Sequence, residues 1–123
     1  MPSASHDDLP LQEVVAGYSS RFADWGGITV AFEKAHQGQD ASSMVEDLPD
    51  GRCQAPHWGY MLSGEVVVTY TNGRQETCSA DDLFYWPPGH SVRVVDDAEV
   101  ILFSPQVEHS RVMDHMLAQM GSG

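Results

Sequence analysis

Apolar and polar positions alternate along short segments through the middle of the chain, which is the pattern of half-buried β-strands. Segments of this kind cover residues 28–33, 57–62, 65–71, 75–78, 83–86, 92–95 and 99–103. Turn residues separate them, among them Asn72-Gly73, which favours a tight hairpin, and Pro87-Pro88-Gly89. Asp96-Asp97 is expected to be a turn between the last two segments. Short strands at this spacing predict an all-β barrel or sandwich.

The last part of the chain has a helical pattern instead. Apolar residues spaced three or four positions apart predict one amphipathic helix that packs on the barrel. These residues are Met113, Met116, Leu117 and Met120. Ser104 is expected to cap this helix, with Pro105 as its first residue. Residues 11–16 fit either a short helix or an edge strand.

The length of 123 residues predicts a single domain. We expect a flexible tail at residues 1–10, the domain at 11–120, and a tag or linker remnant at 121–123. The chain has 18 acidic residues against 6 Lys and Arg, for a formal net charge of −12. This charge argues against a nucleic-acid polymer or an anionic membrane as partner.

The first residues and the cysteines of the chain predict its cellular compartment. The opening MPSASHDDLP has neither the basic region nor the apolar stretch of a secretory signal. Two cysteines, Cys53 and Cys78, without an export signal favour a reducing cytoplasm. No apolar run approaches the ~20 residues of a membrane span. We therefore expect a cytoplasmic protein, monomeric or homodimeric, whose partner is a small molecule.

The order of strands, glycines and prolines resembles the cupin superfamily. Its first motif has the consensus G-x5-H-x-H-x3-4-E-x6-G, and its second G-x5-P-x-G-x2-H. Gly64 matches the last glycine of the first motif, and Pro87-Pro88-Gly89 matches the second motif. The match covers roughly residues 50–95 directly. It implies an all-β fold, a small cupin with a conical antiparallel β-barrel or jelly roll and one C-terminal α-helix.

In cupins, three histidines and a glutamate bind a divalent metal inside the barrel. The resemblance places His57 at the glutamate position, Gly51 at the first histidine position, Cys53 at the second and Val92 at the third. Glycine and valine side chains cannot coordinate a metal, so the implied protein has no metal cofactor. The alternative is a Zn²⁺ or Fe²⁺ cupin that uses Cys53, His57 and His90.

Strand alternation predicts what lines the barrel interior. If His57 points inward, so do Gly59 and Met61, while Trp58, Tyr60 and Leu62 point away. For the next strand, the register that the cupin resemblance implies places Val66, Val68 and Tyr70 on the same inner face. The expected interior residues are then Cys53, His57, Met61, Val66, Val68, Tyr70, Val92 and His90. Such an interior is mostly apolar with a few polar groups, as small-molecule pockets are.

Among cupins, the sequence resembles bacterial metal-independent members, a group that includes dehydratases acting on oxidised nucleosides in antibiotic biosynthesis. This implies a lyase that removes water from a β-hydroxy carbonyl compound, with His57 as the catalytic acid and base. The expected substrate-binding residues are Tyr70, Lys34, His90, Met61, Trp86 and Tyr85. A cupin that only binds a small metabolite is the alternative without catalysis, and in that case His57 is an ordinary buried histidine.

Overall fold

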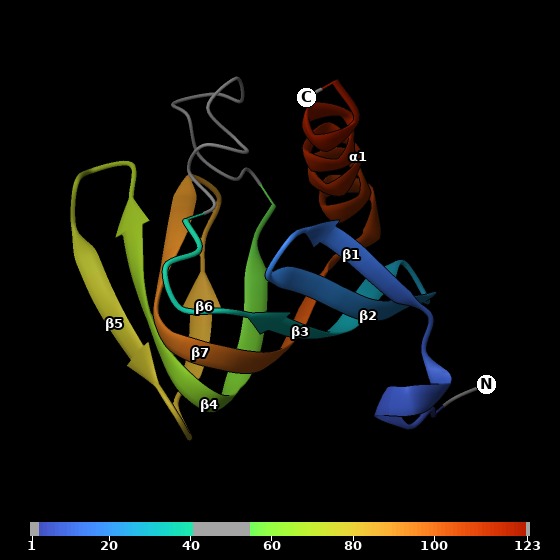
Figure 1. Ribbon diagram of the computed structural model, residues 1–123, viewed down its shortest axis with the longest axis horizontal. Helices are drawn as coiled ribbons and strands as arrows, with labels where there is room; N and C mark the ends of the chain where they lie inside the picture. The colour runs from blue at the N-terminus through green and yellow to red at the C-terminus, as the bar shows by residue number, and fades with distance from the viewer. Residues whose placement is uncertain (1–2, 41–54, 123) are drawn as a thin grey trace.

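The computed structural model describes residues 3–40 and 55–122. The strands are β1 (Leu11–Val15), β2 (Tyr18–Trp25), β3 (Ile28–Ala35), β4 (His57–Tyr70), β5 (Gln75–Ser79), β6 (Leu83–Trp86) and β7 (His90–Pro105). A short 3-10 helix covers His6–Asp8, and the helix α1 covers Gln106–Ser122. The strands pair antiparallel in the order β1-β2-β3-β7-β4-β5, with β6 also on β4 (Figure 1). The predicted all-β fold with one C-terminal helix is confirmed.

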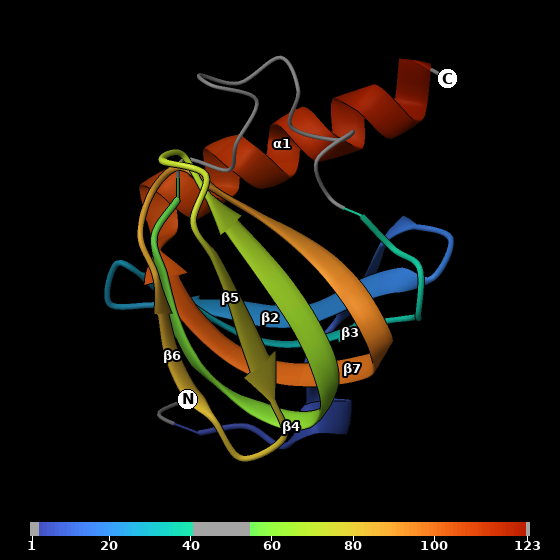
Figure 2. The same ribbon diagram turned by 90° about the vertical axis from the view of Figure 1, so that its left-hand side faces the viewer.

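Two long bent strands form the body of the barrel. The segments expected separately at 57–62 and 65–71 form the single strand β4, and those at 92–95 and 99–103 form β7. The expected turn at Asp96-Asp97 is therefore wrong. The β4–β7 register shifts between Met61 and Val66, so both strands bend there without ending (Figure 2).

Gly64 makes this bend possible. Its φ is +84°, and a Cβ at this position would collide with the Asp97 backbone carbonyl. We expect Gly64→Ala to lower the free energy of unfolding by roughly 2–4 kcal/mol, measured by urea denaturation. Gly73 is the matched control, because its φ is +85° but nothing lies within 4 Å of its would-be Cβ. Equal losses in Gly64→Ala and Gly73→Ala would show that the collision costs nothing.

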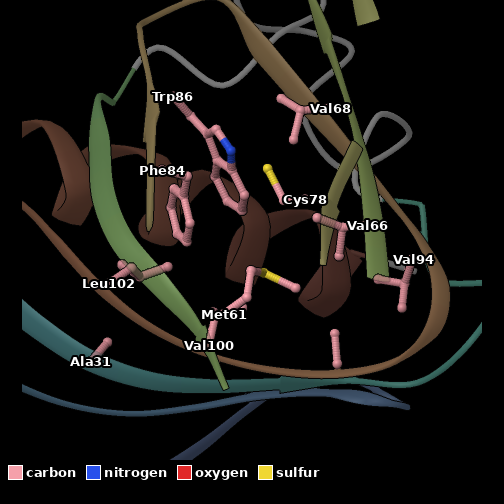
Figure 3. Packing of buried hydrophobic residues seen from close by; sticks show 11 residues of the cluster. Ala31, Met61, Val66, Val68, Cys78, Phe84, Trp86, Val94, Val100 and Leu102 are labelled. Carbon is pink, nitrogen blue, oxygen red and sulfur yellow. The ribbon is translucent and has the colours of Figure 1, made fainter. Parts of the chain in front are cut away.

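The strand register divides the side chains between an inner and an outer face. Met61 is fully buried on the inner face, whereas Trp58 and Leu62 are exposed on the outer one, as the alternation predicts. The inner face holds the main apolar core (Figure 3). Its buried members are Ala31, Met61, Val66, Val68, Cys78, Phe84, Trp86, Val94, Ala98, Val100 and Leu102. Cys78 is a free thiol within it.

The N-terminal strands complete the sheet. Residues 11–15 form an edge strand and not a helix, because they pair with β2. The strand β2 was not predicted from the sequence. Its inward residues include Ser20 and Asp24, which interrupt the alternation of apolar and polar positions that marks a half-buried strand.

The helix α1 packs against β1, β3 and β7, as expected for an amphipathic helix on the barrel. Val112 and Met113 are buried against Val14 and Ala55. The expected cap is wrong: β7 continues through Ser104 and Pro105, and the helix begins at Gln106. Ser104 pairs with Thr29 of β3 instead, and its side chain faces inward. No helix in the described part of the chain is long and apolar enough to cross a membrane.

Candidate functional site

Three histidine side chains from separate elements meet inside the barrel. His57 begins β4, His90 begins β7, and His109 lies in the first turn of α1. The His57 ring centroid is 4.9 Å from that of His90 and 6.1 Å from that of His109. All three side chains are buried. The fold therefore collects at one place three imidazoles that are up to 52 residues apart (109 − 57) in the sequence.

The strand β6 explains why His57 and His90 are neighbours. Trp86, the last residue of β6, is directly opposite His57 in the β4–β6 pairing. The chain then turns through Pro87-Pro88-Gly89, so His90 returns to the same place. The His90 Nδ1 is 2.8 Å from the Pro87 carbonyl oxygen. Because a carbonyl only accepts, this contact makes Nδ1 the protonated nitrogen and leaves the Nε2 lone pair facing away from it.

Ser104 positions the His57 ring. Its Oγ and the His57 Nδ1 form a buried hydrogen bond. The sequence assigned Ser104 to a helix cap and did not include it in the site. Nor did it include His109, which was predicted only as part of the helix. The period-two pattern of 99–103 continues to Ser104 and could have placed it on the inner face.

Burial keeps these histidines uncharged. It lowers the pKa of His57 well below the usual 6.5, and the neighbouring His90 and His109 lower it further. Burial also lowers the pKa of His90, opposed by the Pro87 hydrogen bond, and that of His109, opposed by Asp24. At neutral pH the interior therefore presents imidazole rings that can accept a proton.

Trp86 supplies a flat surface and a donor beside His57. Its indole stacks on the Phe84 ring with centroids 3.9 Å apart and lies edge-on to the His57 ring at 6.2 Å. The Trp86 Nε1 is buried, and among the described residues its neighbouring acceptor is the Cys78 sulfur, which accepts only weakly. Figure 3 shows this nitrogen directed into the barrel, on the side of Cys78. A buried N–H of this kind suits a ligand oxygen, since a weakly paired donor is costly.

The structure places the other expected site residues on both faces of the sheet. Tyr70 is opposite His90 in the β4–β7 pairing, and its hydroxyl donates to Glu76 Oε1 at 3.0 Å. Burial, with the Glu76 contact, raises the pKa of Tyr70. Met61 lies deeper, in the apolar core.

Two of the expected residues are not near the histidines. Lys34 is exposed on the outer face, with its Nζ 3.9 Å from Glu99 Oε1. Tyr85 is also on the outer face, stacked on Trp58. The reason is strand parity: each is adjacent to an inward residue, Glu33 or Trp86, and so points the opposite way.

A second buried polar group, missed by the sequence analysis, lies on β2 and β3. The Tyr18 hydroxyl donates to Glu33 Oε1 at 3.0 Å, and Ser20 lies directly opposite Glu33 in the β2–β3 pairing. Burial raises the pKa of Glu33 to about 7, against the opposing effect of Tyr18 and Ser20. In the strand pairings Glu33 is level with Val100 and Met61, away from His57.

The alternative metal set is not complete in the part of the chain that the structure describes. Cys53 lies outside the described residues. His57 and His90 alone are fewer than the three protein ligands of a catalytic zinc site. No group of three His, Cys, Asp or Glu side chains among the described residues is arranged to hold a metal ion. The described residues therefore supply two ligands of the alternative set, His57 and His90, and do not by themselves form a complete metal site.

Solved structures identify the fold. An RmlC-like cupin from Shewanella frigidimarina superposes with a TM-score of 0.63 over 83% of this chain and 88% of its own, at 14% sequence identity. The chain has the cupin fold. Two further cupin-fold matches are KdgF from Halomonas sp. (TM-score 0.57, 19% identity, 82% and 90% covered) and ectoine synthase from P. lautus (0.65, 9%, 86% and 78%). The sequence matches no protein-family model and no curated protein.

At these identities the cupin resemblance is confirmed for the fold. The part of the resemblance that concerns dehydratases of oxidised nucleosides stays a prediction. The neighbours with this fold include ectoine synthase and the polyketide cyclase RemF, whose names are those of enzymes.

Proposed function

We propose that the protein is a cupin lyase that removes water from a β-hydroxy carbonyl compound by histidine acid–base catalysis, without a metal. The observation that carries this function is His57: a buried imidazole with a lowered pKa, held by Ser104 inside a cupin barrel. A base that is neutral at physiological pH is what proton abstraction beside a carbonyl requires.

The elimination can be balanced on these residues. His57 removes the proton from the carbon next to the carbonyl, and a carbon–carbon double bond forms as the β carbon–oxygen bond breaks. The imidazolium returns its proton to the departing hydroxyl, which leaves as water. We assign both transfers to Nε2, with Nδ1 carrying the ring proton and donating it to the Ser104 Oγ, because this tautomer leaves the lone pair on Nε2. No oxidation or reduction occurs, so no further reactant is needed.

Two neighbours of His57 would bind the substrate. The Trp86 Nε1–H, whose neighbouring acceptor in the described residues is the weakly accepting Cys78 sulfur, would donate to the carbonyl oxygen and stabilise the negative charge that develops there. The stacked Trp86 and Phe84 rings offer a flat apolar wall, which suits a ring such as the base of an oxidised nucleoside. His90 lies close enough to contact the leaving hydroxyl.

The test is incubation of the purified protein with β-hydroxy ketones, β-hydroxy aldehydes and sugar-oxidised nucleosides in D₂O. We expect mass spectrometry to show loss of water, or deuterium exchange at the carbon beside the carbonyl, and a chelator to leave the rate unchanged. Exchange detects the first proton transfer even in compounds that do not eliminate. Recovery of every compound without water loss or exchange would contradict a lyase and favour a metabolite-binding cupin.

Elemental analysis of protein purified without chelator distinguishes the metal-dependent alternative from the metal-free lyase. The observation that favours it is the proximity of the His57 and His90 rings, 4.9 Å apart, because both belong to the alternative set of Cys53, His57 and His90. Near-stoichiometric Zn or Fe, with activity lost on chelation, would show that the protein is a metal enzyme and would contradict metal-free acid–base catalysis. A metal content far below one per chain with activity retained supports the proposed lyase.

A further inference from the structure

The inner face of the sheet carries a row of polar side chains at the level of His57, here called the inner polar row. Asp24 of β2 is directly opposite Thr29 of β3, and Thr29 is directly opposite Ser104 of β7. Ser104 in turn holds the ring of His57 on β4. Thr29 and Ser104 are fully buried, whereas Asp24 is exposed at the end of the row. The row therefore leads from the proposed base, past two hydroxyl groups, to a carboxylate in contact with solvent.

This polar character is confined to one level of the barrel. The neighbouring row on the same face consists of Phe22, Ala31, Leu102, Gly59 and Phe84. None of these side chains can form a hydrogen bond. A buried hydroxyl costs free energy unless it is hydrogen-bonded, and valine would fill the space of Thr29 on a strand without that cost. The hydroxyls beside His57 are therefore explained by what they bind, and not by packing.

The contact between Ser104 and His57 is compatible with two tautomers of the ring. A hydroxyl can accept or donate, so the Ser104 Oγ can accept from a protonated Nδ1 or donate to an unprotonated one. In the second case the ring hydrogen is on Nε2, and this nitrogen cannot act as a base. The proposed elimination needs the first case, because Nε2 must carry the lone pair. Ser104 alone does not select between the two.

Asp24 provides a fixed direction at the far end of the row. The Thr29 hydroxyl donates to the Asp24 Oδ1 at 2.6 Å. Because a carboxylate at neutral pH only accepts, this contact uses the Thr29 hydrogen and leaves the Thr29 oxygen as an acceptor. Thr and Ser side chains that are opposite each other on one face of a sheet are placed to hydrogen-bond across the strands. The Thr29 oxygen is therefore the acceptor that the strand pairing offers to the Ser104 hydroxyl.

We propose that Asp24 and Thr29 are positioning residues that hold His57 in the tautomer with its hydrogen on Nδ1. The His57 Nδ1–H donates to the Ser104 Oγ, and the Ser104 hydroxyl donates to the Thr29 Oγ1. The Thr29 hydroxyl completes the row by donating to Asp24. All the bonds run in the same direction, so the Nε2 lone pair is left for the substrate. The use of this tautomer rests on the proposed function, whereas the tautomer itself belongs to the protein without substrate.

NMR of the protein labelled with ¹⁵N at histidine tests this assignment, because the shift of each ring nitrogen shows whether it carries hydrogen. At about pH 8, where the rings are neutral, we expect Nδ1 of His57 to be the protonated nitrogen in the wild type. Thr29→Val removes the hydroxyl and keeps the shape, and Asp24→Asn replaces the carboxylate by an amide that can also donate. Each should shift the tautomer ratio roughly fivefold toward hydrogen on Nε2, the effect of about one hydrogen bond.

Two further variants are controls. Thr29→Ser keeps a hydroxyl at this position and should have the wild-type ratio. Asp81→Asn is the matched control for the carboxylate, because Asp81 also accepts from a hydroxyl at 2.6 Å, that of Tyr60, but on the outer face. It should leave the His57 tautomer unchanged.

The assignment is overturned by hydrogen on Nε2 of His57 in the wild type, or by an unchanged ratio in both Thr29→Val and Asp24→Asn. An effect of Asp24→Asn alone would also overturn it, since Asp24 would then act through its charge on His109. An effect of Thr29→Val alone would show that Asp24 does not set the direction. Because no substrate is present, a failure of the lyase activity and a failure of this assignment are recorded separately.

Discussion

Replacing His57 by asparagine is expected to lower the rate of water elimination by about 10²–10⁴-fold, the usual contribution of a positioned general base. Asparagine keeps a nitrogen near the position of Nδ1, so the hydrogen bond to Ser104 can persist and the barrel can remain folded. What it lacks is an atom that accepts a proton near neutral pH. The rate is measured on whichever β-hydroxy carbonyl compound the wild type dehydrates.

Two further variants make this result specific. His36→Asn removes an exposed histidine that contacts Asp97 and is not one of the three buried histidines. This variant should therefore leave the rate unchanged. Ser104→Ala should lower the rate less than His57→Asn and shift its pH dependence, because Ser104 acts by positioning the ring. If His57→Asn retained the wild-type rate within twofold while folding normally, His57 would have no part in the chemistry.

Glu33→Gln is expected to stabilise the protein by roughly 3 kcal/mol at about pH 8. Burial raises the pKa of Glu33 from 4.5 to about 7, and a change of this size corresponds to roughly 3 kcal/mol between the protonated and the ionised carboxyl. Because the folded state binds this proton more tightly, the stability it provides is complete below pH 4.5 and is lost as pH rises through about 7. Glutamine is never ionised and can still accept from Tyr18.

The difference in the free energy of unfolding between Glu33→Gln and the wild type should therefore depend on pH. Urea unfolding at about pH 8 should show the full stabilisation, and unfolding at about pH 4 should show almost none. Glu99→Gln is the control, because Glu99 is exposed and pairs with Lys34 at the surface, where substitutions change stability by about 0.5 kcal/mol or less. Equal stabilities of Glu33→Gln and wild type at both pH values would mean that Glu33 is hydrated.

Most of the fold could be predicted from the sequence, because period-two patterning and glycine-rich turns act locally. Residues 83–86 were predicted with the observed bounds, and the inward position of Met61 follows from His57 by alternation. The inward positions of Val66 and Val68 were expected from the register that the cupin resemblance implies. The bend at Gly64 was not predicted. A bulge interrupts the alternation in the same way as a turn, so one strand was interpreted as two.

The site was less predictable, because two of its members depend on long-range packing. Ser104 and His109 reach His57 only when β7 and α1 fold over the barrel, and a polar residue before a helical pattern ordinarily indicates a cap. Lys34 and Tyr85 were selected by residue type, and strand parity places them outside. Glu33 was overlooked because a buried carboxyl has no local sequence signature.

The central claim is that the barrel interior holds a neutral imidazole at His57. NMR titration of the protein labelled with ¹⁵N at histidine measures this directly, with the His57 signals assigned from the His57→Asn spectrum. We predict a midpoint well below 6.5, because burial, His90 and His109 all disfavour the charged ring. A midpoint at or above 6.5 would contradict the account, since His57 would then be a solvated or charged residue and not a buried base.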